Sequence, residues 1–245
     1  MNRCWIALAT GLALGAAVPA ALAQEDAGEL LKQELATKLL GVEATDISES
    51  PIEGIFQITV GTNVAYVSAD GRFLLRGEIY DIETSQNLTE NVRATTRTEM
   101  LGAVDPETIL VFSPPEDEIR HTVTIFTDID CGYCRQFHRD IDRVNELGIA
   151  VHYLFYPRTG PDTESWTKAD KVWCADDRNT AFTGATVENV VPEATCAETP
   201  VRAHFNLGID VGVRGTPSIF SASGELLGGY LRPEELLVAL DESLP

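Results

Sequence analysis

Two cysteines three positions apart, Cys131 and Cys134, constrain this chain more than any other feature of its sequence. They lie in the stretch TDIDCGYCRQFHRD, where a β-branched run gives way to an amphipathic one. A cysteine pair at this spacing serves as a metal clip, a structural disulfide or a redox centre. The segments around the pair and the other cysteines of the chain distinguish these three uses.

The pair lies between a predicted strand and a predicted helix. The run His121–Ile129 is rich in β-branched residues and predicts a strand, and Ile149–Pro157 predicts a second one. Between them, apolar residues recur at intervals of three and four, which predicts a helix that ends at Gly148: Phe137, Ile141, Val144 and Leu147. The two cysteines are therefore expected at a strand-to-helix turn.

The position of the pair predicts different roles for its two members. A sulfur at the first turn of a helix faces unsatisfied N–H groups and the positive end of the helix dipole, which lower its pKa. Cys134 is expected one turn deeper, close enough to form a disulfide and less exposed than Cys131. Cys131 is thus expected to attack and Cys134 to resolve. His138, a further turn along, is expected at the surface.

An acidic thiol favours release more than attack. Lowering a thiol pKa from about 8.5 to about 5 raises the thiolate fraction at pH 7 about 30-fold. Nucleophilicity falls about 40-fold over the same interval. The benefit lies in Cys131 as a leaving group and in the stability of the reduced pair. The flanking residues are expected to shift this pKa in opposite directions, Asp130 upward and Arg135 downward.

The metal clip and the structural disulfide are both disfavoured for Cys131 and Cys134. A zinc site needs a second CxxC pair or two histidines at ligand spacing. Cys174 and Cys196 are separated by 21 residues, and only His138 is near the motif. A CxxC disulfide closes too small a loop to stabilise a fold much through chain entropy. We expect no metal, and no cofactor beyond the redox-active cysteines.

The first 23 residues have the pattern of a cleavable secretory signal peptide. Arg3 precedes an apolar run from Trp5 to Val18, and small residues flank the expected cleavage site at residues 21–23. The apolar run is short for a membrane span, which needs about 20 residues. Export leaves four cysteines, an even set that favours disulfides in an oxidising compartment.

The charge of the chain excludes some classes of partner. It carries 38 acidic and 18 basic residues, a formal net charge of −20. Such a surface repels nucleic acid and anionic membranes, so neither is expected to bind.

The segment before the cysteine motif predicts a small domain followed by a linker. Residues 24–40 predict a helix with Gly41 as its stop, and three β-like runs follow, with a reversal at Ala69–Arg72. A unit of about 60 residues has little core and commonly needs a partner, so residues 24–83 are expected to dimerise. Residues 84–105 are polar and are expected to form an exposed linker helix.

Residues 106–245 predict the order β-α-β, helical insertion, β-β-α. The insertion, Pro161–Thr183, carries Trp166 and Trp173, which are expected to pack it against the domain. A strand follows Pro217, and Pro233 opens a last helix. This order has the outline of a thioredoxin-like fold, in which the proline before the third strand is cis and packs against the CxxC turn. The preceding backbone is then free to pair with an extended client chain.

These motifs together resemble a known family. The features are FTDIDCGYC, Gly215-Thr216-Pro217, the Cys174 and Cys196 pair, and the small N-terminal α+β unit. They are similar to the bacterial periplasmic DsbC/DsbG-type thiol:disulfide interchange proteins, and CGYC is closest to the DsbC type. The resemblance implies an α+β homodimer: N-terminal cystatin-like domains pair, a linker helix follows, and thioredoxin-like domains with a helical insertion face an apolar cleft.

The resemblance also implies an activity. It is disulfide isomerisation of misfolded exported proteins in the periplasm, with some chaperone activity and with reduction by a membrane thiol reductase of the DsbD type. A DsbG-like thiol reductase or a thiol oxidase on the same scaffold is the alternative. A holdase that needs neither active cysteine is a third, non-enzymatic hypothesis.

Residue roles follow from the matching positions. Cys131 carries over as the nucleophile and Cys134 as the resolving thiol, with Gly132 and Tyr133 in the active-site loop between them. Thr216 and Pro217 carry over as the cis-proline loop.

The resemblance implies that Cys174 and Cys196 form a structural disulfide. Closing their loop contributes about 3 kcal/mol in the chain-entropy model. A second redox centre is the alternative for this pair.

Overall fold

The computed structural model describes residues 20–243, with side chains from residue 28 onward. The expected signal peptide falls mostly on residues 1–19, which lie outside the described residues. The chain divides into two compact units: residues up to 58 with 66–74, and residues 59–65 with those from 75 onward. Within the described residues, no helix is long and apolar enough to cross a membrane.

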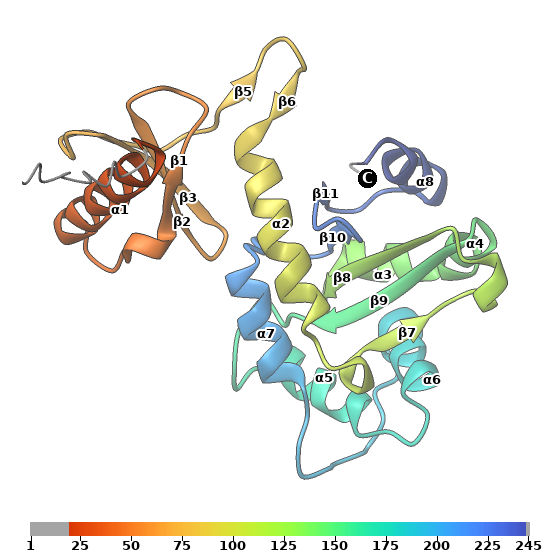
Figure 1. Cartoon of the computed structure of the whole chain (residues 1–245). Coiled ribbons are helices and arrows are strands. Elements are labelled where there is room, and N and C mark those ends of the chain that lie inside the picture. Colours follow the sequence, from red (N-terminus) through yellow and green to blue (C-terminus); the bar gives the residue numbers. More distant parts are fainter. Residues whose placement is uncertain (1–19, 244–245) are drawn as a thin grey trace, which may run out of the picture. The chain divides into compact units, whose positions relative to one another are not determined.

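The first unit packs one helix, α1 (Ala20–Lys38), against a four-stranded sheet of order β1-β2-β3-β4 (Figure 1). Its strands are β1 (Ile47–Glu49), β2 (Ile55–Val60), β3 (Asn63–Ser68) and β4 (Leu74–Leu75). Four buried residues form its core: Leu35, Ile47, Ile58 and Val67. The predicted helix is confirmed, but Leu30 and Leu40 are exposed, so its inward face is narrow.

The predicted reversal at Ala69–Arg72 is confirmed. Gly71 has a φ of 68°, and its N–H donates to the Ser68 carbonyl at 2.7 Å. A Cβ at Gly71 would lie 2.7 Å from the Lys38 side chain. Glycine is therefore required here both by the backbone angle and by the close approach of α1.

The second unit contains a five-stranded sheet of order β11-β10-β8-β9-β7. Its strands are β7 (Leu110–Phe112), β8 (His121–Thr127), β9 (Ile149–Phe155), β10 (Ser218–Ser221) and β11 (Leu226–Gly228). Strands β8 and β9 are parallel, and the other pairs are antiparallel. The predicted order of strands is confirmed, with β7 as an additional edge strand.

Helices cover both faces of this sheet (Figure 1). They are α2 (Leu88–Gly102), α3 (Gly132–Arg139), α4 (Ile141–Glu146), α5 (Glu164–Trp173), α6 (Arg178–Thr183), α7 (Val201–Asp210) and α8 (Pro233–Glu242). The predicted helix after the cysteine motif is divided at Asp140 into α3 and α4. A π-helical turn at Gly184–Glu188 extends α6. The sequence pattern does not predict this turn.

Alternation along the central strands divides the core into two layers. On β9, Val151, Tyr153 and Phe155 join the cluster that includes α3, α4, α5 and α8, whereas Leu154 joins the opposite cluster. The opposite cluster includes the end of α2 and part of α7. Because successive side chains of a strand point to opposite faces, one buried strand supplies both layers.

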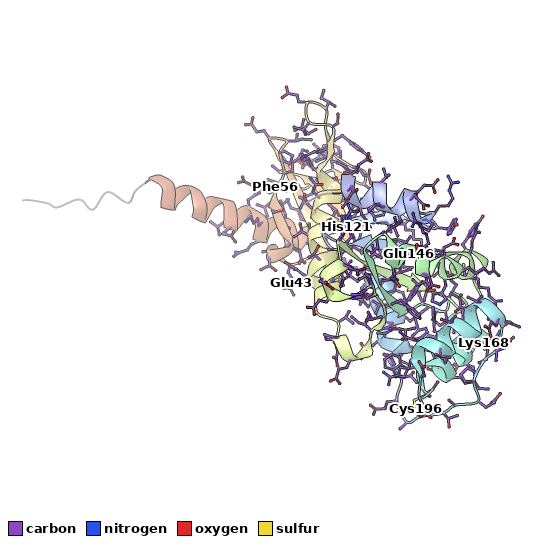
Figure 2. The ribbon with its side chains drawn as sticks, turned by 90° about the vertical axis from the view of Figure 1, so that its right-hand side faces the viewer. Glu43, Phe56, His121, Glu146, Lys168 and Cys196 are labelled. Carbon is purple, nitrogen blue, oxygen red and sulfur yellow. A yellow bond between two sulfur atoms is a disulfide. The ribbon has the colours of Figure 1, made fainter. Side chains whose placement is uncertain are left out.

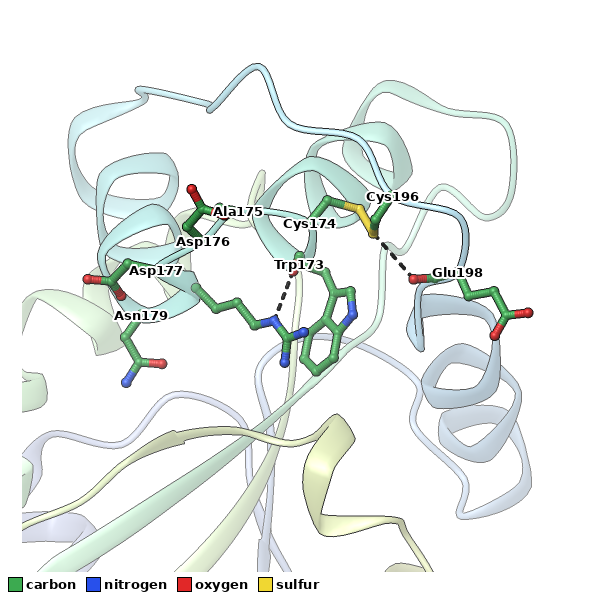
Figure 3. Close-up of a pocket in the computed structure, with 9 residues that line it drawn as sticks. Trp173, Cys174, Ala175, Asp176, Asp177, Asn179, Cys196 and Glu198 are labelled. Atoms are coloured by element: carbon green, nitrogen blue, oxygen red, sulfur yellow. Dashed lines mark hydrogen bonds between the residues drawn. A yellow bond between two sulfur atoms is a disulfide. The ribbon is translucent and has the colours of Figure 1, made fainter.

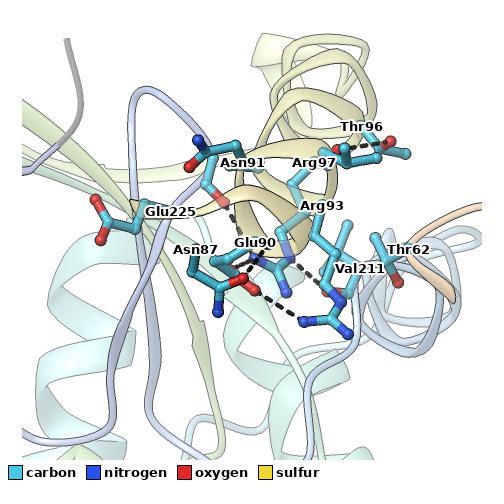
Figure 4. Close-up of polar contacts among 12 residues, drawn as sticks. Thr62, Asn87, Glu90, Asn91, Arg93, Thr96, Arg97, Val211 and Glu225 are labelled. Carbon is cyan, nitrogen blue, oxygen red and sulfur yellow. Dashed lines mark hydrogen bonds and ion pairs between the residues drawn. The ribbon is translucent and has the colours of Figure 1, made fainter. Parts of the chain in front are cut away.

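The expected linker helix is shorter and less exposed than its polar sequence suggests. A hairpin of β5 (Tyr80–Asp81) and β6 (Gln86–Asn87) precedes it, and the Asn87 side chain caps α2 by accepting from the Glu90 N–H. Arg97 is buried: its Nε donates to the Val211 carbonyl at 3.1 Å, and its guanidinium pairs with Glu90 (Figure 4). The polar side chains of α2 thus make buried contacts within this unit.

Candidate active site

The cysteine motif lies at the end of β8, as the sequence predicts. Cys131 is the N-cap residue of α3, with extended backbone angles of −81° and 123°, and Cys134 lies in the first turn of the helix. Both side chains are 2 % exposed. Relative exposure therefore does not separate the two cysteines, because a second loop covers Cys131. Burial is nevertheless the main cause of the pKa shift at Cys134 and not at Cys131, as expected for the deeper thiol.

That covering loop contains Thr216 and Pro217, joined by a cis peptide bond. The Cys131 Sγ donates to the Thr216 carbonyl at 3.0 Å. Pairing of β10 with β8, with Ser218 opposite Phe126, brings this loop beside the motif although 85 positions separate the two residues in the chain. The structure thus brings together Cys131, Cys134, Thr216 and Pro217.

The two residues between the cysteines face outward. Tyr133 is 63 % exposed, and its ring stacks on that of Tyr230 with centroids 6.1 Å apart. Gln136 donates to the Tyr230 hydroxyl at 3.2 Å. A Cβ on Gly132 would meet no atom within 4 Å, so the backbone there is open. Tyr230, which lies between β11 and α8, was not predicted as part of the site.

The surroundings of the two thiols separate their acidities. A hydrogen bond with the Cys134 thiol is the main cause that lowers the pKa of Cys131 to about 5; hydrogen bonds with Thr216 and the Cys134 N–H and the charge of Arg158 lower it further, against burial. Burial raises the pKa of Cys134, and the hydrogen bond with Cys131 raises it further. Near neutral pH, Cys131 is the thiolate and Cys134 the thiol.

A buried carboxylate supports the turn that carries Cys131. Asp128 is 2 % exposed, and its carbonyl accepts from the Cys131 N–H at 3.0 Å. Its Oδ2 accepts two hydrogen bonds from Arg158, and its Oδ1 accepts from Ser165 and from the Asp130 N–H. Burial raises the pKa of Asp128, but these hydrogen bonds outweigh burial and hold the pKa below its ordinary value.

The flanking charges Asp130 and Arg135 are paired with each other. Asp130 Oδ1 lies 3.4 Å from Arg135 Nη2 and 2.9 Å from the Nζ of Lys168. Lys168 belongs to α5 (Figure 2). Arg135 also donates to the Ile129 carbonyl at 2.9 Å and to the Asn189 amide oxygen at 3.1 Å. Arg135 thus ties the turn before Cys131 to the end of the insertion, and Arg158 supplies the positive charge toward Cys131.

His138 is buried, so its expected place at the surface is wrong. It is 1 % exposed and lies among Phe112, Tyr153 and Phe182. Its ring nitrogens lie 3.2 Å from the Tyr153 hydroxyl and 2.9 Å from the Thr183 hydroxyl. Burial lowers its pKa to about 4, so the ring is neutral near pH 7. The helical insertion buries His138, which sequence periodicity alone does not indicate.

The second cysteine pair forms a disulfide away from the motif. The Cα atoms of Cys174 and Cys196 are 5.3 Å apart, across 22 positions of the chain. The disulfide borders an open pocket of about 610 Å³ that Trp173 and Glu198 also line (Figure 3). Trp166 and Trp173 are 8 % and 6 % exposed, which confirms that they pack the insertion.

Comparison with known proteins places the chain in a family. Residues 19–90 match the disulfide bond isomerase protein N-terminal domain, and residues 116–244 match a thioredoxin-like domain. The thiol:disulfide interchange protein DsbC of Dickeya dadantii is 37 % identical over 204 residues, 82 % of each chain. DsbC of Haemophilus influenzae is 38 % identical over 199 residues, 80 % of this chain and 83 % of the relative.

The chain belongs to the DsbC family of thiol:disulfide interchange proteins. It is a thiol:disulfide oxidoreductase with a DsbC N-terminal domain and a thioredoxin-like domain, as the resemblance implied. A solved structure with the same fold is a disulfide interchange protein from Neisseria gonorrhoeae, with a TM-score of 0.50 and 21 % identity over 56 % of this chain and 97 % of that one. The expected α+β fold class is confirmed.

Two further features of this DsbC-family chain bear on its site. Among residues 20–243, no three His, Cys, Asp or Glu side chains are grouped so as to hold a metal ion. Four residues that the cysteine motif itself does not indicate also lie around it: Asp128, Arg158, Ser165 and Tyr230. For Asp128 a signal was available, because it is a carboxylate directly after a strongly apolar strand.

Proposed function

We propose that this protein is a periplasmic disulfide isomerase in which Cys131 attacks wrong disulfides of exported proteins. The Cys131 thiolate forms a bond with one client sulfur as the client S–S bond breaks, and the other client sulfur leaves as a thiolate. The observation that carries this proposal is the pair of free cysteines at the start of α3, with Cys131 at the N-cap beside the cis Thr216–Pro217 loop. These surroundings lower the pKa of Cys131 to about 5 and raise that of Cys134. One sulfur is thus ready to attack while its neighbour keeps its proton.

The mixed disulfide has two exits. In isomerisation, a second client thiolate attacks the client sulfur, a new client disulfide forms, and Cys131 leaves as a thiolate. In reduction, Cys134 attacks the Cys131 sulfur, the client leaves as a thiolate, and a Cys131–Cys134 disulfide remains for a membrane thiol reductase of the DsbD type to reduce. The low pKa of Cys131 favours the first exit because it makes Cys131 the better leaving group.

The neighbouring loop supports binding of an extended client. The Thr216 carbonyl accepts the Cys131 S–H at 3.0 Å. The Cys131 thiolate and the mixed disulfide both lack this S–H, so in both states the carbonyl is available to a client N–H, as in strand addition. Thr216 and Pro217 would form one wall of the client site. Gly132, with its open backbone, and the exposed Tyr133 would form the other.

We assign the same roles to the parts of the chain as the sequence suggested. Residues 1–23 direct export, residues 24–83 pair two copies, residues 84–105 connect them, and residues 106–245 carry the catalytic site. Pairing is supported by the match to the isomerase N-terminal domain and by the edge strand β4, where Leu74 and Leu75 are about half exposed. An apolar edge strand invites pairing with another chain. The paired copies would also shield unfolded clients, which is the proposed chaperone activity.

The isomerase assignment is tested with a scrambled protein that has several disulfides. The wild-type protein in a thiol buffer should restore the activity of this client, and Cys131→Ala should not. Trapping with Cys134→Ala should accumulate mixed disulfides, because the reductive exit is removed. Recovery by Cys131→Ala at the wild-type rate would contradict the proposal. A pair found mostly oxidised in the periplasm would indicate an oxidase instead.

Pairing is tested with Leu74→Lys, which places a charge on the β4 edge. Sedimentation should show a monomer that still reduces a simple disulfide but isomerises the scrambled client poorly. Ile82→Lys is the control, because Ile82 is 91 % exposed and lies in the turn between β5 and β6. A Leu74→Lys protein that stays dimeric would exclude β4 as the pairing edge.

A further inference from the structure

The loop after β9 brings one arginine to the active-site turn. Arg158 follows Pro157 directly, and both its backbone N–H and its Nε donate to Asp128 Oδ2 at 3.0 Å. Ser165, at the start of α5, donates to the other oxygen of the same carboxylate. Three segments of the chain therefore meet at Asp128, which is itself three residues before Cys131.

This arrangement fixes Arg158 relative to Cys131. The Cys131 N–H donates to the Asp128 carbonyl at 3.0 Å. Asp128 thus contacts the turn that carries the sulfur through its backbone, and it contacts Arg158 through its side chain. The Arg158 side chain is 45 % exposed, whereas that of Asp128 is 2 % exposed. The buried Asp128 carboxylate accepts from both the backbone N–H and the Nε of Arg158, and these two hydrogen bonds together restrict the orientation of the arginine.

We propose that Arg158 stabilises the Cys131 thiolate by its charge, and that Asp128 and Ser165 are positioning residues that hold Arg158 for this role. The inference rests on the proposed function, in which Cys131 is the nucleophile. Arg158 makes Cys131 a better leaving group and stabilises the reduced pair. The isolated carboxylate of Asp128 would do the opposite, and its pairing with Arg158 offsets that charge.

The other charged or titratable groups around the turn are already engaged or face away. Asp130 pairs with Arg135 and Lys168, and Lys168 also pairs with Glu164. His138 faces Tyr153 and Thr183 and is neutral above a pH of about 4. Arg214, on the loop that ends in Thr216, and Glu188, at the end of the π-helical turn, are exposed. The charge of Arg158 contributes to the low pKa of Cys131, after the hydrogen bonds with Cys134 and Thr216.

The test is the thiolate titration of the reduced full chain, followed by absorbance near 240 nm, with Cys131→Ser to assign the signal. Arg158→Gln should raise the pKa of Cys131 by about one unit. Arg158→Lys should raise it less, because it keeps the charge and loses only the Nε hydrogen bond to Asp128. Ser165→Ala should shift the pKa upward by less than Arg158→Gln. Arg143→Gln is the control: Arg143 is a half-exposed arginine of α4 that pairs with Glu146 and Glu234.

The reduction potential of the Cys131–Cys134 pair gives a second readout. A purely structural role of Arg158 would not predict the direction in which this potential changes. A tenfold loss of thiolate stability corresponds to about 30 mV, so Arg158→Gln should make the pair that much more reducing against a thiol buffer. An unchanged Cys131 pKa in Arg158→Gln, or an equal rise in Arg143→Gln, would overturn the proposal. If Arg158→Gln does not fold, Ser165→Ala decides, and an unchanged Cys131 pKa in that variant overturns the proposal.

These outcomes are separate from failure of the proposed function. If the low-pKa signal survives in Cys131→Ser, the assignment of Cys131 as the nucleophile is wrong. If the signal disappears in Cys131→Ser but does not respond to Arg158, only the role of Arg158 is wrong.

Discussion

The two cysteine pairs of this chain can both form a disulfide, but they lie in different surroundings. Cys131 and Cys134 are both free and buried at a helix N-terminus, beside a loop carbonyl and near an oriented arginine. Cys174 and Cys196 are bonded to each other across 22 positions, and Cys196 lies on an exposed loop. The reactivity of a cysteine therefore depends on which groups contact its sulfur, and its solvent exposure alone does not predict that reactivity.

The largest expected effect separates the pairs by activity. Cys131→Ser should reduce isomerisation of a scrambled client to the uncatalysed background, because the attacking sulfur is gone. The double variant Cys174→Ser with Cys196→Ser should keep most of its activity at a temperature where it is folded. Activity is followed by regain of client function. Equal losses in both variants would show that the pairs do not differ in role.

The next effect separates the pairs by stability. Removing the Cys174–Cys196 disulfide should lower the free energy of unfolding by about 3 kcal/mol, because the unfolded chain regains the freedom of that loop. Denaturant unfolding with reduced active-site thiols gives the value. Cys131→Ser should change stability much less at pH 5. A loss below about 1 kcal/mol for the double variant would contradict a structural role.

A third effect depends on pH and is confined to the active-site pair. The pKa of Cys131 is about 5 in the folded protein and about 8.5 in an unfolded chain. Its contribution to the stability of the reduced protein is therefore fully present above about 8.5 and is lost as the pH falls through about 5.

The measurement is the difference in unfolding free energy between the reduced wild type and Cys131→Ser. This difference in unfolding free energy should grow from pH 5 to pH 8. The rate of alkylation of Cys131 should rise as the pH passes through 5 and then reach a plateau. The Cys174–Cys196 disulfide does not titrate and should add no such signal. A difference that stays constant with pH would contradict the low pKa of Cys131.

The smallest effect concerns packing next to the disulfide. The Arg178 guanidinium lies 3.6 Å from the centre of the Trp173 ring, and its Nε donates to the Trp173 carbonyl at 2.9 Å. Arg178→Ala should cost about 1 kcal/mol of stability. It should leave the Cys131 pKa and the isomerase rate unchanged. A changed alkylation profile of Cys131 in this variant would show that the two regions are coupled.

Much of the active site could be predicted because its signals are local. Cys131 and Cys134 are three positions apart, so a strand before them and a helix after them already place them at a turn. The Thr216–Pro217 dipeptide directly precedes β10, which makes it recognisable once the order of strands is known. Turn residues such as Gly71 are also local, because backbone angle and residue type are linked at one position.

The sequence by itself determined the element order, the cysteine motif and the family resemblance, since these depend on near neighbours and on periodicity. Only the tertiary structure decided that His138 is buried, that Arg97 on a polar helix is buried, and that Arg158 and Ser165 converge on Asp128. The contacts of Arg158 and Ser165 with Asp128 join residues 30 and 37 positions apart and follow from how β9 and α5 pack on the sheet. No periodicity encodes such pairings, because they depend on where whole elements lie and not on the spacing within one.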